Sequence, residues 1–160
     1  MDFHELYTQY VRDVHRFAMY LSCNPTLADD ITSETFLRAW SSAAPIREAT
    51  VKAYLFTIAR NVYLRELRRS PPQVELHESI PSPAPSQDER VEQQAMLNTV
   101  LRALRGLPEL DRAALLMRTQ DAMSYDEIAH SLQLSVSTAK VKVHRARLKL
   151  ASLVRRTVLP

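Results

Sequence analysis

Apolar residues recur at intervals of three and four along most of the chain, the spacing that places them on one face of an α-helix. The stretch from Ser124 to Leu150 shows it most clearly, because Ala139, Val143, Ala146 and Leu150 fall within about 60° of one another around a helix. Similar patterns cover residues 2–21, 27–40, 51–69 and 91–119. Few stretches alternate as a strand would, and the chain has a single glycine. The pattern predicts a nearly all-α protein.

Capping signals divide the stretch 124–150 into two helices. Ser124 is followed three residues later by Glu127, which is a capping box that starts a helix. Gln133 and Leu134 interrupt the pattern, and either Ser135 or Ser137 can cap a second helix after them. Two short helices joined by a turn of about three residues make a helix-turn-helix.

The second of these helices carries a basic face opposite its buried stripe. Its centre is Ser137, Val141 and Leu148, flanked on one side by Lys140, His144 and Arg147 and on the other by Lys142, Arg145 and Lys149. No acidic residue follows Glu127. Such a face suits the DNA major groove, where the cations hold phosphates while the central side chains approach base edges. An ordinary solvated surface helix is the alternative, and the preceding capped helix and short turn favour DNA.

Two earlier helices also have unusual faces. The helix over 27–40 spreads its apolar residues around much of its circumference, with Asp30 and Glu34 among them, which equally favours a surface that meets another protein or the central helix of a small bundle. The helix over 51–69 leaves a narrow polar face of Tyr54, Thr57, Asn61, Arg65 and Arg68. That face could bind unpaired bases. A satisfied buried amide at Asn61 and solvated arginines are the simpler alternative.

Charge and composition add the domain organisation. The 160 residues carry a net charge of +3, which permits a nucleic-acid partner without requiring one. Residues 70–90 are rich in proline and serine and hold four acidic residues against Arg90 alone. They predict a flexible acidic linker between two small helical domains, 1–69 and 91–160, the second a helix-turn-helix domain.

Other classes of protein are disfavoured. Cys23 is the only cysteine, so a disulfide framework or a cysteine-rich metal site is excluded. We find no apolar run long enough for a membrane span and no signal peptide, and therefore expect a soluble cytoplasmic protein. The sequence shows no pairing of nucleophile and base and no phosphate-binding glycine loop. We expect no catalytic activity, no metal and no cofactor.

Three stretches, in this order and spacing, resemble the extracytoplasmic-function (ECF) group of bacterial RNA polymerase sigma factors. They are DDITSETFLRAW at 29–40, YLFTIARNVYLRELRR at 54–69 and LPELDRAALLMRTQDAMSYDEIAHSLQLSVSTAKVKVHRARLKL at 107–150. The group belongs to the sigma-70 family and folds as two domains, called regions 2 and 4. The resemblance implies that 1–69 is region 2 and 91–160 is region 4. It also implies a promoter-specificity factor that binds core RNA polymerase, recognises the minus-thirty-five and minus-ten elements and assists strand opening.

The resemblance also assigns residues and partners. Binding to the clamp of the largest polymerase subunit would fall to Asp30, Ser33, Glu34, Leu37 and Trp40. Contacts with the minus-ten element would fall to Tyr54, Arg60, Asn61, Arg65 and Arg68. Contacts with the minus-thirty-five element would fall to Ser137, Thr138, Lys140, Val141, Lys142, His144, Arg145 and Arg147. Region 4 would also bind the flap of the second-largest subunit, the linker would run toward the active-site cleft, and an anti-sigma factor is expected.

Departures from the family leave two other functions open. The family usually has glutamine where this chain has Ser33, and glycine at Ala122, Gln133 and Ser137. A left-handed residue at Gln133 would cost roughly 1–2 kcal/mol relative to glycine, so the angle of the helix-turn-helix depends on that turn. The first alternative is a helix-turn-helix regulator that binds an operator without polymerase. The second is an adaptor that binds only proteins.

Overall fold

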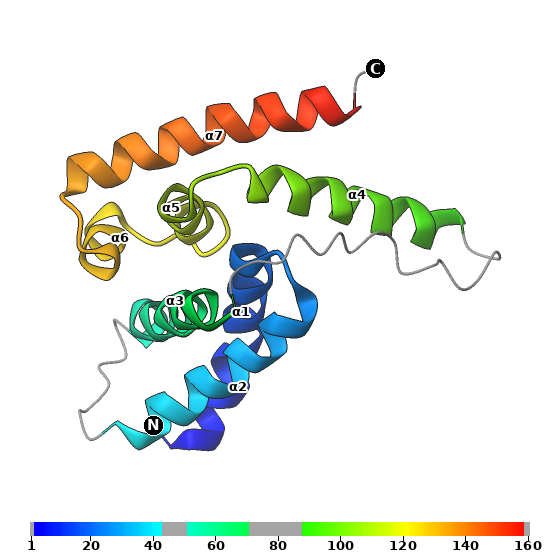
Figure 1. The fold of residues 1–160 in the computed structure, drawn as a ribbon. Coiled ribbons are helices and arrows are strands. Elements are labelled where there is room, and N and C mark those ends of the chain that lie inside the picture. The colour runs from blue at the N-terminus through cyan, green and yellow to red at the C-terminus, as the bar shows by residue number, and fades with distance from the viewer. Residues whose placement is uncertain (1, 43–50, 71–87, 159–160) are drawn as a thin grey trace.

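The computed structural model describes residues 2–42, 51–70 and 88–158 (Figure 1). Within these ranges it has seven helices and no strand, which confirms the predicted all-α fold. The helices are α1 (Phe3–Ser22), α2 (Pro25–Ser41), α3 (Val51–Arg69), α4 (Asp88–Arg105), α5 (Glu109–Thr119), α6 (Tyr125–Leu132) and α7 (Val136–Val158). Most of the expected linker lies outside the described residues. Its last residues form the first turn of α4, where Asp88 and Glu89 complement the helix dipole.

Side-chain caps set the corners of the N-terminal half. Asp2 accepts a hydrogen bond from the Glu5 N–H at 2.8 Å, and Glu5 accepts one from the Asp2 N–H at 3.3 Å. The Asn24 side chain caps α2 by accepting from the N–H groups of Thr26 and Leu27. Cys23, at a φ of 54°, makes the left-handed turn between α1 and α2. These caps fix the angle at which α2 leaves α1.

The N-terminal half buries its large side chains between α1, α2 and α3. The rings of Phe17 and Phe56 stack with centroids 4.4 Å apart and an angle of 7° between their planes. The other large, fully buried side chains of this half are Val14, Leu21, Ile31, Phe36, Val51, Leu55 and Val62. One face of α2 is therefore part of this core, and only its other face is available to a partner.

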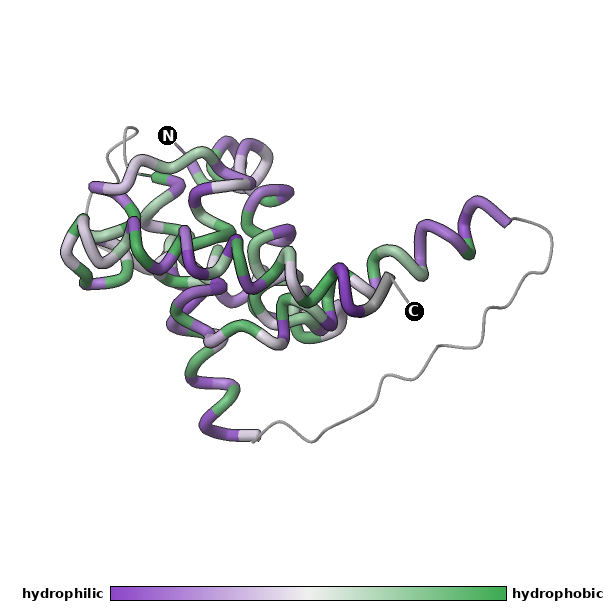
Figure 2. Tube along the Cα trace, turned by 90° about the horizontal axis from the view of Figure 1, so that it is seen from above, coloured by the Kyte–Doolittle hydropathy of each residue, from purple (hydrophilic) through white to green (hydrophobic). Residues whose placement is uncertain are grey.

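The C-terminal half is built around α5, which packs against both α6 and α7. Ala139, Val143 and Ala146 of the predicted stripe are buried there, while Leu150 is half-buried. Gly106 ends α4 without the left-handed φ that its position suggested. A Cβ at Gly106 would lie 2.7 Å from a methyl of Leu153, so close approach of α7 explains this glycine. The hydrophilic N-terminal turns of α4 extend beyond the other helices (Figure 2).

The two halves lie against each other, with α1 and α3 packed on α5 and α6 (Figure 1). Buried apolar side chains of both halves form one connected cluster. The sequence predicted two small domains joined by a linker and left their relative placement open. The contacts across the boundary include Arg16–Asp121 at 3.0 Å, Lys52–Asp121 at 3.5 Å, Thr57–Ser131 at 2.6 Å, Arg60–Glu109 at 2.7 Å and Arg112–Tyr63 at 3.2 Å.

Asp121 is a buried charge at this boundary. Its side chain has no exposed surface, and its Oδ2 atom lacks a hydrogen-bond partner among the described residues. Burial raises the pKa of the Asp121 carboxyl, although Lys52 and Arg16 act in the opposite direction and Asp13 adds to the rise. The boundary thus holds an acid that is costly to ionise.

Candidate nucleic-acid interface

The helix-turn-helix is present as α6, a short turn and α7. Ser124 Oγ accepts from the Glu127 N–H at 3.1 Å, and Glu127 accepts from the Ser124 N–H at 3.3 Å, so the predicted capping box forms. Gln133 has a φ of 56°, the left-handed conformation that glycine would occupy at lower cost. The N–H of Leu134 donates to the Ala129 carbonyl at 2.8 Å and closes the turn. The motif therefore keeps the left-handed turn despite lacking the glycine.

The first turn of α7 is capped by hydroxyl groups. Ser135, rather than Ser137, takes the cap position and accepts from the Thr138 N–H at 3.1 Å. The Ser135 hydroxyl also donates to the Thr138 hydroxyl at 2.7 Å. Ser137 and Thr138 are thus ordered at the exposed beginning of the helix. Side chains there stand where an HTH recognition helix contacts base edges.

The far side of α7 faces solvent. Val141 and Leu148 are large apolar side chains that are 58% and 62% exposed. On one side of them lie three further exposed residues from the predicted set, Lys140, His144 and Arg147. The Lys140 ammonium lies 5.7 Å from the centre of the Tyr125 ring on α6, which ties this edge to the first helix of the motif.

Two of the three cations on the other basic edge of α7 are paired with a carboxylate of α5. Lys142 Nζ donates to Asp111 Oδ1 at 3.1 Å, and Arg145 Nε donates to Asp111 Oδ2 at 3.0 Å. Burial acts to raise the pKa of the Asp111 carboxyl, but hydrogen bonds from Arg145 and Lys142 outweigh it and the pKa is lowered. The same bond raises the pKa of Arg145. The two basic edges, which looked equivalent in the sequence, differ in the fold.

Sequence reasoning missed Asp111 because its partners lie 31 and 34 positions further along the chain. One signal was available. Asp111 lies two positions before the apolar run from Ala113 to Met117 in the sequence, and the structure buries it with that run. A carboxylate in such a run needs a cationic partner, since an unpaired buried charge is very costly.

The polar face of α3 divides into exposed and paired residues. Asn61 and Arg68 are exposed, and Tyr54 is half-buried, so the alternative of a buried amide at Asn61 is wrong. Arg65 donates to Glu34 of α2. Arg60 donates two hydrogen bonds to Glu109 of α5, at 2.7 and 2.8 Å.

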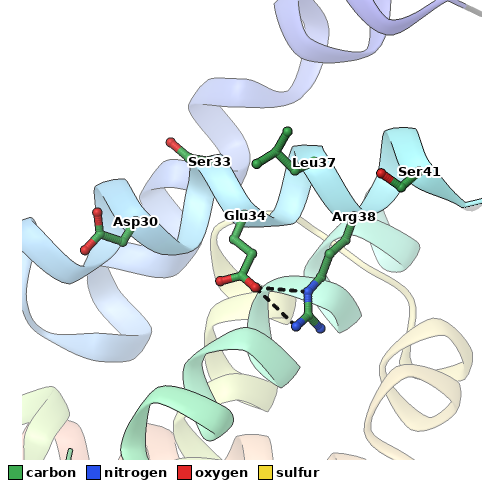
Figure 3. A pocket seen from close by; sticks show the side chains of 6 residues that line it. All are labelled: Asp30, Ser33, Glu34, Leu37, Arg38 and Ser41. Atoms are coloured by element: carbon green, nitrogen blue, oxygen red, sulfur yellow. Dashed lines mark hydrogen bonds and ion pairs between the residues drawn. The ribbon is translucent and has the colours of Figure 1, made fainter. Parts of the chain in front are cut away.

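The predicted protein-binding face of α2 is open to solvent. Leu37 and Trp40 are 63% and 60% exposed, although both are large and apolar. Asp30, Ser33, Glu34, Leu37, Arg38 and Ser41 line a shallow hollow along the helix (Figure 3). In Figure 3 the Glu34 side chain turns toward Arg38, whose guanidinium it binds at 3.2 Å. An apolar surface with fixed carboxylates at its edge is typical of a protein contact.

In the described parts of the chain, no group of three or more histidine, cysteine, aspartate or glutamate side chains is placed to hold a metal ion. Among the same residues, every helix is too short or too polar to cross a membrane.

Comparison with known proteins gives matches in both halves. The family described as Sigma-70 region 2 matches residues 6–71, and the family described as Sigma-70, region 4 matches residues 97–150. The chain is 29% identical over 99% of its length to the ECF RNA polymerase sigma factor SigM of Bacillus subtilis, of which it covers 98%. It is 33% identical over 90% of its length to the ECF RNA polymerase sigma factor EcfG of Rhodopseudomonas palustris, of which it covers 80%.

A solved structure also resembles the whole chain. It is the sigma factor RpoE of Bartonella quintana in complex with the anti-sigma factor NepR. The TM-score is 0.72 at 26% identity, and the likeness covers 96% of this chain and 97% of that one. The two family models therefore match the halves separately, and this structure matches both halves together.

Proposed function

The chain belongs to the ECF group of sigma-70 family sigma factors, which act in transcription initiation, and on this premise we propose how its faces share that work. It binds the core RNA polymerase, carries it to a promoter through α7 and holds the opened strand with α3. Catalysis of RNA synthesis belongs to the polymerase.

The exposed face of α2 binds the clamp of the largest polymerase subunit. Support comes from Leu37 and Trp40, whose exposed apolar surface gains free energy when a partner covers it. Asp30 and Glu34 add two carboxylates beside Leu37, which can pair with cations of the partner. The C-terminal half binds the flap of the second-largest subunit. An anti-sigma factor is a second partner, as it is for the similar RpoE.

The exposed face of α7 reads the minus-thirty-five element in the major groove. Ser137, Thr138 and Val141 approach the base edges, and Val141 suits a thymine methyl. Lys140, His144 and Arg147 lie along the adjacent phosphates, where cations strengthen binding by releasing counterions. Lys142 and Arg145 belong to the same helix, but they differ from the other three cations because they are hydrogen-bonded to Asp111.

The polar face of α3 receives the minus-ten element after melting. Separating the strands costs a mean of about 1.4 kcal/mol per stacked step. Stacking of an extruded base on a protein side chain contributes about 1–3 kcal/mol and offsets part of that cost. Asn61 offers an exposed amide for such a base, next to Tyr54 and Arg68. Arg60 and Arg65 reach the strand after exchanging their carboxylate partners for phosphates.

The observation that carries this proposal is that the chain exposes the large apolar side chains Leu37 and Trp40 on α2 as well as the basic face on α7. A regulator that acts alone on an operator has no use for the α2 face. An adaptor that binds only proteins has no use for the α7 face.

A gel-shift experiment separates the three functions. The full chain is mixed with promoter fragments enriched from random sequence by the reconstituted holoenzyme, with and without polymerase core. A sigma factor shifts the fragments specifically only when core is present. A specific shift by the chain alone indicates an operator-binding regulator, and no shift in either case indicates an adaptor.

A further inference from the structure

Asp111 joins α5 to the DNA-facing helix through three hydrogen bonds. Its carboxylate accepts from Lys142 Nζ at 3.1 Å, from Arg145 Nε at 3.0 Å and from Arg145 Nη2 at 3.3 Å. The residue is 2% exposed, so water does not replace these partners. All three residues lie in the C-terminal half, so the contact does not depend on how the two halves are placed.

The bonds to Asp111 engage two cations of the basic face, Lys142 and Arg145, although the Arg145 side chain is still 58% exposed. At about 100° per residue, Arg145 lies about 40° from Val141 around α7, close to the centre of the exposed face. A free arginine there could form the two-pronged contact with guanine that is the commonest specific contact in the major groove. With Nε and Nη2 bonded to Asp111, one of the two donor edges of the Arg145 guanidinium is already used.

We propose that Asp111 is a specificity-determining positioning residue for promoter recognition. It holds Lys142 and Arg145 away from the duplex, so that the Val141 centre and the Lys140 edge of α7 decide which sequence is bound. Non-specific binding is limited at the same time, because a cation that stays paired with Asp111 contacts no phosphate and releases no counterion from DNA. The inference rests on the proposed role of α7 as the reader of the minus-thirty-five element.

The test compares Asp111→Asn with Asp126→Asn in the full chain. Both variants remove one negative charge from the helix-turn-helix half, but Asp126 is exposed in the first turn of α6. Affinity for a non-promoter duplex of 20 base pairs is measured by fluorescence anisotropy from 50 to 200 mM salt. Each additional phosphate contact steepens the slope of log K against log salt by about 0.9.

Asp111→Asn should steepen that slope by up to about 1.8, because two cations are released to contact phosphates. The ratio of the variant's affinity to the wild-type affinity should therefore fall about 12-fold between 50 and 200 mM salt. Asp126→Asn should leave the slope near that of the wild type. The added slope should vanish when Asp111→Asn is combined with Lys142→Gln and Arg145→Gln. Equal slopes for Asp111→Asn and the wild type, or equal changes in both aspartate variants, overturn the proposal.

Specificity is measured on the holoenzyme with a selected promoter fragment and the same fragment with a scrambled minus-thirty-five element. Asp111→Asn should lower the ratio of the affinity for the selected fragment to that for the scrambled fragment. If Asp111 only stabilised the fold, its loss would lower both affinities by the same factor. Circular dichroism checks that the variant folds. If Asp111→Asn does not fold, the salt dependence of Lys142→Gln is compared with that of Lys140→Gln. Loss of the Lys140 phosphate contact should make the slope of log K against log salt about 0.9 shallower. An equal loss in both lysine variants overturns the proposal, and a clearly smaller loss for Lys142→Gln supports it.

These experiments also separate this proposal from the proposed function. If the wild-type holoenzyme does not distinguish the two fragments, α7 is not the reader and the proposed function fails. If the wild type distinguishes them and Asp111→Asn does so equally well, only the role of Asp111 fails.

Discussion

Breaking the ion pair between Arg60 and Glu109 should loosen the contact between the two halves. Arg60 lies on α3 and Glu109 at the beginning of α5, and they share two hydrogen bonds at 2.7 and 2.8 Å. Their side chains are only 17% and 21% exposed. The same arginine is proposed to meet single-stranded DNA, which requires this pair to open.

The size of the effect follows from that partial burial. Hydrogen bonds to charged groups contribute about 1.5–3 kcal/mol when protected, and exposed ion pairs about 0–1 kcal/mol. The Arg60–Glu109 pair falls between these cases, so we expect a coupling energy of about 1–2 kcal/mol. Glu109→Gln should therefore change the ratio of joined to separated halves by about 5- to 30-fold.

The assay measures the distance between spin labels on the two halves by pulsed electron resonance. Labels are attached at Thr8→Cys on α1 and Asp126→Cys on α6, both exposed, whereas the native Cys23 is buried and reacts slowly. Glu109→Gln should add a population at longer distance. The matched control is Glu92→Gln, which removes the same charge from an exposed position of α4.

The reasoning is refuted if Glu109→Gln and Glu92→Gln give the same distance distribution as the wild type. It is also refuted if a double-mutant cycle of Arg60→Gln with Glu109→Gln gives a coupling energy near zero. In either case the apolar contacts of α1 and α3 with α5 and α6 hold the halves together without this pair.

Three further predictions concern the binding faces and the boundary. Leu37→Ala should weaken core binding at least about tenfold, as measured by titration of labelled core. Because Leu37 is exposed, the same substitution should change the free energy of unfolding in urea by less than about 0.5 kcal/mol. The pKa of Asp121 is raised in the folded state. Its contribution to stability is therefore present at pH values below the pKa of the unfolded chain, and it is lost as the pH rises through the pKa of the folded protein. The stability of Asp121→Asn relative to the wild type should therefore increase from pH 4 to pH 7 in urea unfolding, and parallel pH profiles would contradict this. Lys140→Ala should weaken holoenzyme binding to all duplexes about equally, whereas Val141→Ala should change the preferred base; equal losses on every sequence for both variants would show that the two roles are misassigned.

Periodic patterns predicted the helices well because each helix buries a face whose residues are three and four positions apart. The buried positions Ala139, Val143 and Ala146 follow from spacing alone, and so does the exposure of Val141 on the opposite side. The capping box at Ser124 is equally local. Features that depend on neighbours within one helix were therefore available before the fold was known.

Contacts between distant segments were not available in that way. Asp111 and its partners on α7 are more than thirty positions apart, and Arg16 and Asp121 are 105 apart. No periodicity connects such pairs, and their side chains looked like solvated charges. At Gln133 the sequence argued against a left-handed turn, yet the packing of α6 and α7 on α5 outweighs that local cost of about 1–2 kcal/mol.

The most direct test of the account is permanganate footprinting of the holoenzyme on a selected promoter, comparing the wild type with Asn61→Ala. Asn61 is exposed on α3, so the substitution leaves the proposed core-binding face of α2 and the proposed duplex-binding face of α7 intact. The account predicts that both holoenzymes bind the promoter, that thymines in the minus-ten region react in the wild type, and that this reactivity is lost or strongly reduced in the variant. Equal thymine reactivity in the two holoenzymes, or no reactivity with the wild type, would contradict it.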